Sequence, residues 1–88
     1  MKTFTDASGR GWIASVREEE GPDYKGRWFL VLEAEDRSGE RLELQDVRWN
    51  GERTARRTLE TMSVVELRRR LRAALGRHGQ RRASLVAR

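Results

Sequence analysis

The residues with the clearest chemical potential are arginines near the C-terminal end of the chain. Seven of them lie within fifteen residues: Arg68, Arg69, Arg70, Arg72, Arg77, Arg81 and Arg82. A guanidinium group binds phosphate through paired hydrogen bonds and stacks on bases, so this density favours contact with a nucleic-acid backbone. We predict that all of them except Arg70 contact phosphates. An internal or protein–protein role and a plain solvated helix face are the alternatives, because arginine is also a good helix former.

The charge of the chain changes sign near its midpoint. Residues 1–49 carry eight basic and eleven acidic side chains, whereas residues 50–88 carry eleven arginines and three acids, the last of them Glu66. Such asymmetry indicates an anionic partner for the basic half, most often nucleic acid, either DNA or RNA. It also fits a basic tail that folds back on the acidic half, or one that docks on an acidic protein.

Aromatic side chains are the second candidate group, because a sheet with aromatics on an open face stacks unpaired bases. Phe29 falls on the face opposite the predicted core, and Trp49 lies beyond a slip in the strand pattern. We predict that both rings are exposed and contact single-stranded nucleic acid. Trp12 and Trp28, which lie on neighbouring predicted strands, are expected to form part of the core instead.

The sequence lacks the residue sets expected of an enzyme. It has no cysteine, and its single histidine, His78, has no partner for a metal site or a catalytic triad. The glutamates at 18–20 are predicted to form a solvated loop. The eight glycines are scattered at turns and form no phosphate-binding loop. We therefore expect a non-enzymatic protein without a metal or other cofactor.

The length of the chain, 88 residues, leaves room for one core. No apolar run approaches the roughly 20 residues of a membrane span, and the N-terminus lacks the apolar segment of a signal peptide. We expect a cytoplasmic protein with no membrane partner. A domain of this size is only marginally stable alone, so a homodimer is an attractive source of additional buried area.

The first half of the chain has the alternating pattern of antiparallel β-strands. Four strands are predicted, at Lys2–Thr5, Gly11–Glu18, Arg27–Glu35 and Arg41–Trp49. Turns are predicted at residues 6–9 and 36–39, where Asp and Gly take the positions that such turns favour. The last strand slips out of phase before Val47, which indicates a β-bulge near Gln45 and Asp46.

The second half changes to helical periodicity. A short helix is predicted over Glu52–Leu59, with Glu52–Arg56 and Arg56–Glu60 ion pairs. Ser63 and Glu66 have the spacing of a capping box, so a second helix should begin there and run to about Leu75, ending at Gly76 or Gly79. The apolar stripe of this helix is Val64, Leu67, Leu71, Ala74 and Leu75.

Together these elements predict one α+β domain over residues 1–76, with the sheet in 1–49 and the helical part in 50–76. A basic, flexible tail follows at 77–88. Four antiparallel strands in meander order should be covered on one face by one or two helices. The predicted core is Trp12, Val16, Trp28, Leu30, Leu32, Leu42, Leu44, Leu59, Leu67, Leu71 and Leu75. Over residues 1–76 the order of four strands and a helix resembles that of Whirly- and PUR-type single-strand-binding modules. The sequence has no motif of those families, so the likeness is one of architecture and favours nucleic-acid binding only slightly.

The functional hypothesis is a non-enzymatic nucleic-acid-binding module whose Arg-rich helix and tail contact phosphates. The alternative is a small adaptor that docks an acidic protein through its basic helix or tail, or adds a partner strand to a sheet edge. Leu85 and Val86 bear on this choice, because an apolar pair among arginines suits a protein-docking motif better than a phosphate contact.

Overall fold

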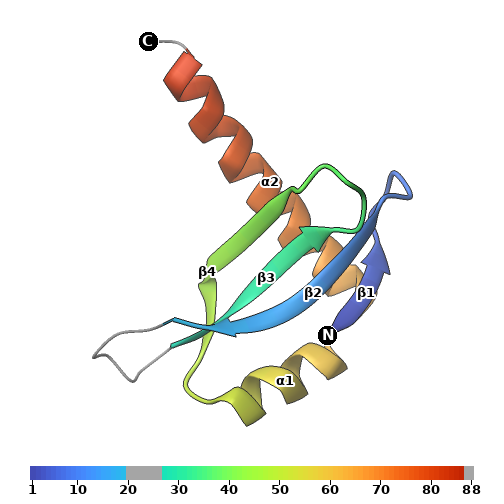
Figure 1. The fold of residues 1–88 in the computed structure, drawn as a ribbon, viewed down its shortest axis with the longest axis vertical. Helices are drawn as coiled ribbons and strands as arrows, with labels where there is room; N and C mark the ends of the chain where they lie inside the picture. The colour runs from blue at the N-terminus through green and yellow to red at the C-terminus, as the bar shows by residue number, and fades with distance from the viewer. Residues whose placement is uncertain (20–26, 87–88) are drawn as a thin grey trace.

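The computed structural model describes residues 1–19 and 27–86, with side chains described as far as Arg77. It confirms an α+β fold in which four antiparallel strands, paired in the order β1-β2-β3-β4, precede two helices. The elements are β1 (Lys2–Thr5), β2 (Gly11–Glu18), β3 (Trp28–Ala34), β4 (Arg41–Trp49), α1 (Glu52–Thr61) and α2 (Val64–Val86). Figure 1 shows α2 passing behind the sheet from the β1 side and projecting beyond β4.

Two turns of the same chemistry connect β1 to β2 and β3 to β4. In each, an aspartate Oδ1 accepts a hydrogen bond from the backbone N–H of a serine two residues later, at 2.9 Å in both Asp6–Ser8 and Asp36–Ser38. The next residue is a glycine with φ of +88° in the first turn and +73° in the second. Only glycine adopts this conformation at little cost, so the two predicted turns are confirmed together with their physical basis.

The core lies between the sheet and the two helices. Side chains from all four strands meet apolar residues of α1 and α2, and the buried cluster includes Phe4, Trp12, Ala14, Leu30, Leu32, Leu42, Leu44, Leu59, Leu67, Leu71 and Ala74. Of the predicted core, Val16, Trp28 and Leu75 are only partly buried. Val64, assigned to the apolar stripe of the second helix, is exposed. It lies in the first turn of α2, next to Val65, which is also exposed.

The predicted bulge is confirmed in β4. Leu30 pairs with Leu44, but the preceding residue of β3, Phe29, pairs with Arg48. Residues 45–47 of β4 therefore have no opposite partner in this register. The bulge turns Val47 into the core, where it is buried, and this explains why it is out of phase with Leu42 and Leu44.

The beginning of α2 is also confirmed. The backbone N–H of Glu66 donates to Ser63 Oγ at 3.1 Å, so Ser63 caps the helix as predicted. The Glu66 carboxylate instead lies 3.0 Å from Arg70 and 3.5 Å from Arg69. In α1 the Glu52–Arg56 pair forms at 3.0 Å, whereas the expected Arg56–Glu60 pair is absent from the described contacts.

The predicted end of the second helix is wrong. The helix continues through Gly76 and Gly79 to Val86. Gly76 does not adopt the positive φ of a helix-terminating glycine. One glycine costs a helix only about 1 kcal/mol relative to alanine, and the neighbouring arginines, alanines and leucines favour the helix. The helix thus crosses the boundary expected at residue 76, while a separate flexible tail stays a prediction.

Lys2 joins the first strand to the end of α1. Its Nζ donates to the carbonyl oxygens of Glu60, at 3.2 Å, and of Met62. These carbonyls lie at the C-terminal end of the helix, where a cation is favoured by the helix dipole. The charge of Lys2 is therefore used within the fold.

Candidate nucleic-acid interface

One side of α2 presents three arginines away from the core. Leu67, Leu71 and Ala74 are buried against the sheet, and helical geometry places residues 68, 69 and 72 away from that buried stripe. We call Arg68, Arg69 and Arg72 the cationic face. All three are among the predicted phosphate-binding residues, and the structure brings them together on adjacent turns of one helix.

Arg68 is held in place without being neutralised. Its Nε donates to the Thr5 carbonyl oxygen at 2.7 Å, and a terminal nitrogen donates to Thr5 Oγ1 at 3.3 Å. Both acceptors are uncharged, so the positive charge of the guanidinium remains uncompensated. The contact also ties α2 to the end of β1, which fixes the position of the cationic face relative to the sheet.

The other two arginines of the cationic face are open to solvent. Arg72 is exposed and has no ion pair within the described part of the chain. Arg69 is 73% exposed, and its one ion pair within the described residues is a 3.5 Å approach to Glu66, a carboxylate that lies closer to Arg70. An exposed pair of this kind contributes at most about 1 kcal/mol, so an external anion can readily replace it.

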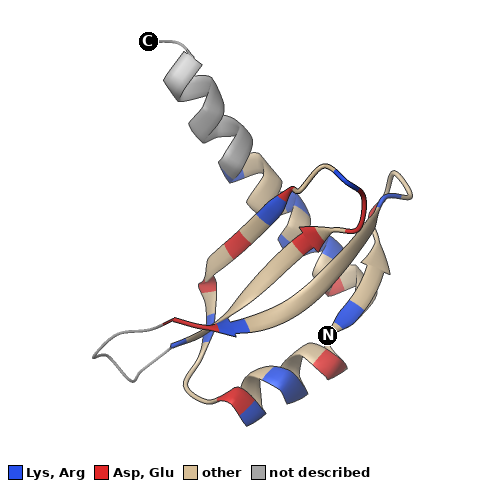
Figure 2. Ribbon diagram, viewed as in Figure 1, with Lys and Arg blue, Asp and Glu red and all other residues tan. Residues whose placement is uncertain are grey.

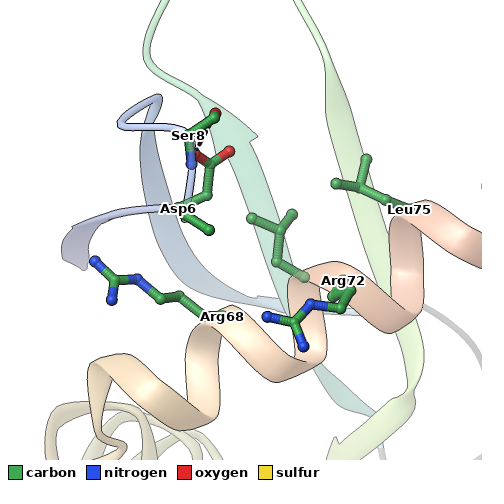
Figure 3. A pocket seen from close by; sticks show the side chains of 7 residues that line it. Asp6, Ser8, Arg68, Arg72 and Leu75 are labelled. Carbon is green, nitrogen blue, oxygen red and sulfur yellow. Dashed lines mark hydrogen bonds between the residues drawn. The ribbon is translucent and has the colours of Figure 1, made fainter.

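A hollow of about 220 Å³ lies between α2 and the turn that follows β1. It is lined by Ala7, Leu71 and Leu75, with Asp6, Ser8, Arg68 and Arg72 around them. Figure 3 shows Arg68 and Arg72 extending from one side of α2, across from the Asp6–Ser8 turn. The hollow thus has an apolar lining, two guanidinium groups one helical turn apart and one carboxylate, that of Asp6.

Asp6 supports the turn rather than acting as an acid or base. Its carboxylate accepts hydrogen bonds from Ser8 Oγ at 2.6 Å, from Trp12 Nε1 at 3.0 Å and from the backbone of Ser8 and Arg10. These bonds, chiefly the one from the Ser8 side chain, lower the pKa of Asp6 from 3.8 to about 2. The group therefore stays ionised at neutral pH, and its described contacts are with the turn and with Trp12 of β2.

Most of the described acids of the sheet and its turns pair with arginines of the same half of the chain. The ion pairs are Arg10 with Asp36 and Glu40, Arg17 with Glu33, Arg27 with Glu18, Arg41 with Glu43, and Arg48 with Glu19. Figure 2 shows basic and acidic residues together on the strands. The arginines of the sheet thus neutralise much of its negative charge. Its acids are therefore not left free to pair with the basic half.

Within the described residues, one ion pair joins a helix arginine to the sheet. It links Arg77 to Asp46 at 3.5 Å, and the two side chains are 54% and 62% exposed. A basic tail that folds back on the acidic half stays a prediction, because the tail side chains beyond Arg77 lie outside the described residues. Among the predicted phosphate contacts whose side chains are described, Arg77 is the one that pairs with an acid of the sheet.

The two predicted stacking aromatics do not join the cationic face. Phe29 lies on the helix-free face, but its ring is only 6% exposed, and the Arg48 guanidinium lies 5.8 Å from the ring centroid. The expectation of an exposed Phe29 ring is wrong, because a long charged side chain from β4 covers it. Trp49 is partly buried and packs against the core on the side of the helices.

The remaining predictions concern the last turns of α2. Arg81 and Arg82 lie on the helical backbone, as do His78, Leu85 and Val86, and their side chains are outside the described set. Conversely, two arginines of α1 escaped the sequence analysis. Arg53 and Arg57 are exposed, one turn apart, and without an ion pair in the described residues. Like charges four residues apart destabilise a helix, so the spacing of these two arginines could have identified them in the sequence.

Comparison with known proteins adds no functional assignment. No family model matches the chain, and neither a similar curated protein nor a similar solved structure was found. The described residues also contain no group of three or more histidines, cysteines or acids able to hold a metal ion. In the same part of the chain, every helix is too short or too polar to span a membrane.

Proposed function

We propose that this protein is a non-enzymatic nucleic-acid-binding module that contacts the phosphate backbone through the cationic face of α2. The observation that carries the proposal is the separation of charge: arginines of the sheet pair with its acids, whereas Arg68 and Arg72 meet no carboxylate in the described structure. Uncompensated guanidinium groups on a firmly packed helix are suited to a polyanion, because binding releases the counterions of the nucleic acid.

The cationic face favours backbone contact over base recognition. Arg68 is oriented by Thr5, and Arg72 projects from the next turn of the same helix, so both can reach one phosphate or two neighbouring ones. Phosphate contacts fix position and carry no sequence information directly. We therefore expect weak sequence preference, and no preference for single strands that depends on Phe29, since its ring is covered.

Two finer expectations belong to this proposal. A cytoplasmic location follows from it, because the protein would meet cellular nucleic acid there. A homodimer would place two cationic faces on one assembly and increase avidity for a long polyanion. Arg77, Arg81 and Arg82 would extend the contact along α2.

The proposal predicts a specific change in the salt dependence of binding. Binding to a labelled DNA duplex is measured by fluorescence anisotropy at several salt concentrations between roughly 50 and 200 mM. These measurements give the slope of log affinity against log salt concentration. Replacing both Arg68→Gln and Arg72→Gln should weaken binding and reduce the magnitude of the slope by about 2, one unit for each lost phosphate contact. A labelled single strand of the same length is measured in parallel.

The matched control removes the same charge from the sheet. Arg17→Gln with Arg37→Gln leaves the cationic face intact, so its slope should stay close to that of the original protein. Equal losses in both double variants would mean that only net charge matters. No binding at low salt, together with Arg68- and Arg72-dependent binding to poly-glutamate, would instead indicate the alternative function, an adaptor for an acidic protein.

A further inference from the structure

The two edges of the sheet are protected to different degrees. β1 is only four residues long, and the carbonyl oxygen of its last residue, Thr5, accepts a hydrogen bond from Arg68. β4 is nine residues long. In its second half the bulge interrupts the strand, and Arg48 donates to the Gln45 carbonyl oxygen at 2.8 Å. Short edges and bulges are the usual protection against strand pairing, so residues 41–44 form the open part.

The direction of the backbone groups in this open part follows from one hydrogen bond. The Ala34 N–H donates to the Glu40 carbonyl oxygen at 2.9 Å, so the backbone of Glu40 points toward β3. Backbone groups alternate along a strand, and Leu42 therefore also faces β3, while Arg41 and Glu43 direct their N–H and C=O groups outward. Within the described residues, no hydrogen bond reaches these outward groups.

We propose that β4 pairs antiparallel with β4 of a second copy of this chain, about a two-fold axis at Leu42. In this register Arg41 lies opposite the partner's Glu43, and Glu43 lies opposite the partner's Arg41. The outward N–H and C=O groups of each pair then exchange hydrogen bonds. Arg41 and Glu43 already lie 3.3 Å apart on the helix-free face of one chain, and both are exposed to an approaching strand.

The charges select this register over its neighbours. An axis at Arg41 would put two arginines opposite one another, and an axis at Glu43 would do the same with two glutamates. Like charges that are directly opposite destabilise a strand pair. A two-fold axis that passes between two residues would place outward backbone groups of one strand opposite inward groups of the other. No ladder of hydrogen bonds could then form between the two strands. The sequence Arg-Leu-Glu is thus complementary to itself in one antiparallel arrangement. For that reason we infer that the strand added at the β4 edge comes from a second copy of this chain.

The path of α2 adds to the contact. The helix projects beyond β4, as Figure 1 shows, so a copy added at this edge would also lie beside the projecting turns. The two chains would form one eight-stranded sheet with both helical layers on the same side. Dimerisation is a common source of additional stability for a domain of this size. The inference does not depend on the proposed function.

Charge reversal tests both the dimer and its register. Light scattering after gel filtration should give the original protein about twice the chain mass of 10.3 kDa. Arg41→Glu alone makes both cross-strand pairs acidic, and Glu43→Arg alone makes both basic. Each variant should dimerise roughly ten- to a hundredfold more weakly. An equimolar mixture of the two variants restores opposite charges, so it should recover a dimer with one chain of each kind, which native mass spectrometry can identify.

Controls separate this effect from loss of folding. Arg17→Glu disrupts the Arg17–Glu33 pair on the same face but away from the edge, and its mass should stay that of the dimer. Circular dichroism establishes that each variant is folded. The proposal would be overturned if the original protein were a monomer, or if none of the edge variants weakened the dimer. It would also be overturned if the mixture of the two variants failed to form the mixed dimer. A monomer that captures a strand of another protein would overturn it as well.

Discussion

At the scale of single residues, the fold depends on polar side chains that the turns bring together. Arg10 lies 2.7 Å from Asp36 and 2.9 Å from Glu40, and its guanidinium stands 4.9 Å from the Trp12 ring centroid. The hydrogen bonds to Asp36 and Glu40 raise the pKa of Arg10, and the bond from Arg10 holds the pKa of Asp36 well below its usual range. Arg10 thus joins the two hairpin turns, and its charge is used structurally, in contrast to those of the cationic face.

Asp6 predicts a dependence of stability on acid pH. Its pKa is about 2 in the folded chain, against 3.8 ordinarily, so folding favours the ionised form. The stability that Asp6 contributes is complete above about pH 4 and is lost as the pH falls toward 2. Urea unfolding followed by Trp fluorescence should therefore show that Asp6→Asn costs more stability at pH 6 than at pH 2.

A second variant tests the cause of this shift. Ser8→Ala removes the hydrogen bond that lowers the pKa of Asp6 most, so it should move the loss of stability to higher pH. An Asp6→Asn deficit that stays constant from pH 6 to pH 2 would contradict the account. So would an acid transition that Ser8→Ala does not move.

At the scale of elements, the orientation of α2 determines what the chain presents to a partner. Ser63 caps this helix, and removing an N-cap side chain typically costs about 1 kcal/mol. We expect Ser63→Ala to lower the free energy of unfolding by about that amount, as measured by urea denaturation. Ser63→Asp keeps an oxygen acceptor and should retain most of the stability. The account would be wrong if alanine were as stable as serine, or if aspartate were no better than alanine.

The sequence predicts the strands, turns and helix starts better than it predicts where a helix ends or which side chains cover an exposed face. Alternation, the paired Asp–Gly turns and the Ser63 cap are local signals, and each is confirmed. The end of α2 was not predictable, because Gly76 and Gly79 weigh little against many helix-favouring neighbours. Alternation correctly placed Phe29 on the helix-free face. The cover over its ring comes from Arg48 on the next strand, and this contact depends on the register of the bulge.

At the scale of the whole molecule, the separation of charge is the central feature. The sequence shows that the two halves differ in sign, but the pairing of the acids depends on contacts between distant residues, such as Arg10 with Asp36. For this reason the sequence left open whether the basic half folds back on the acidic one. In the described structure the acids of the sheet serve mainly its own arginines, and the cationic face remains available to a partner.

The central claim is that Arg68, Arg69 and Arg72 bind an external polyanion, and the nucleic-acid content of the purified protein tests it most directly. The ratio of absorbance at 260 and 280 nm is measured before and after a high-salt wash, for the original chain and for a variant with all three arginines replaced by glutamine. We predict a high ratio that falls after the wash in the original chain, and a low ratio throughout in the variant. A low ratio in both proteins, or a high ratio that the three substitutions leave unchanged, would contradict the claim.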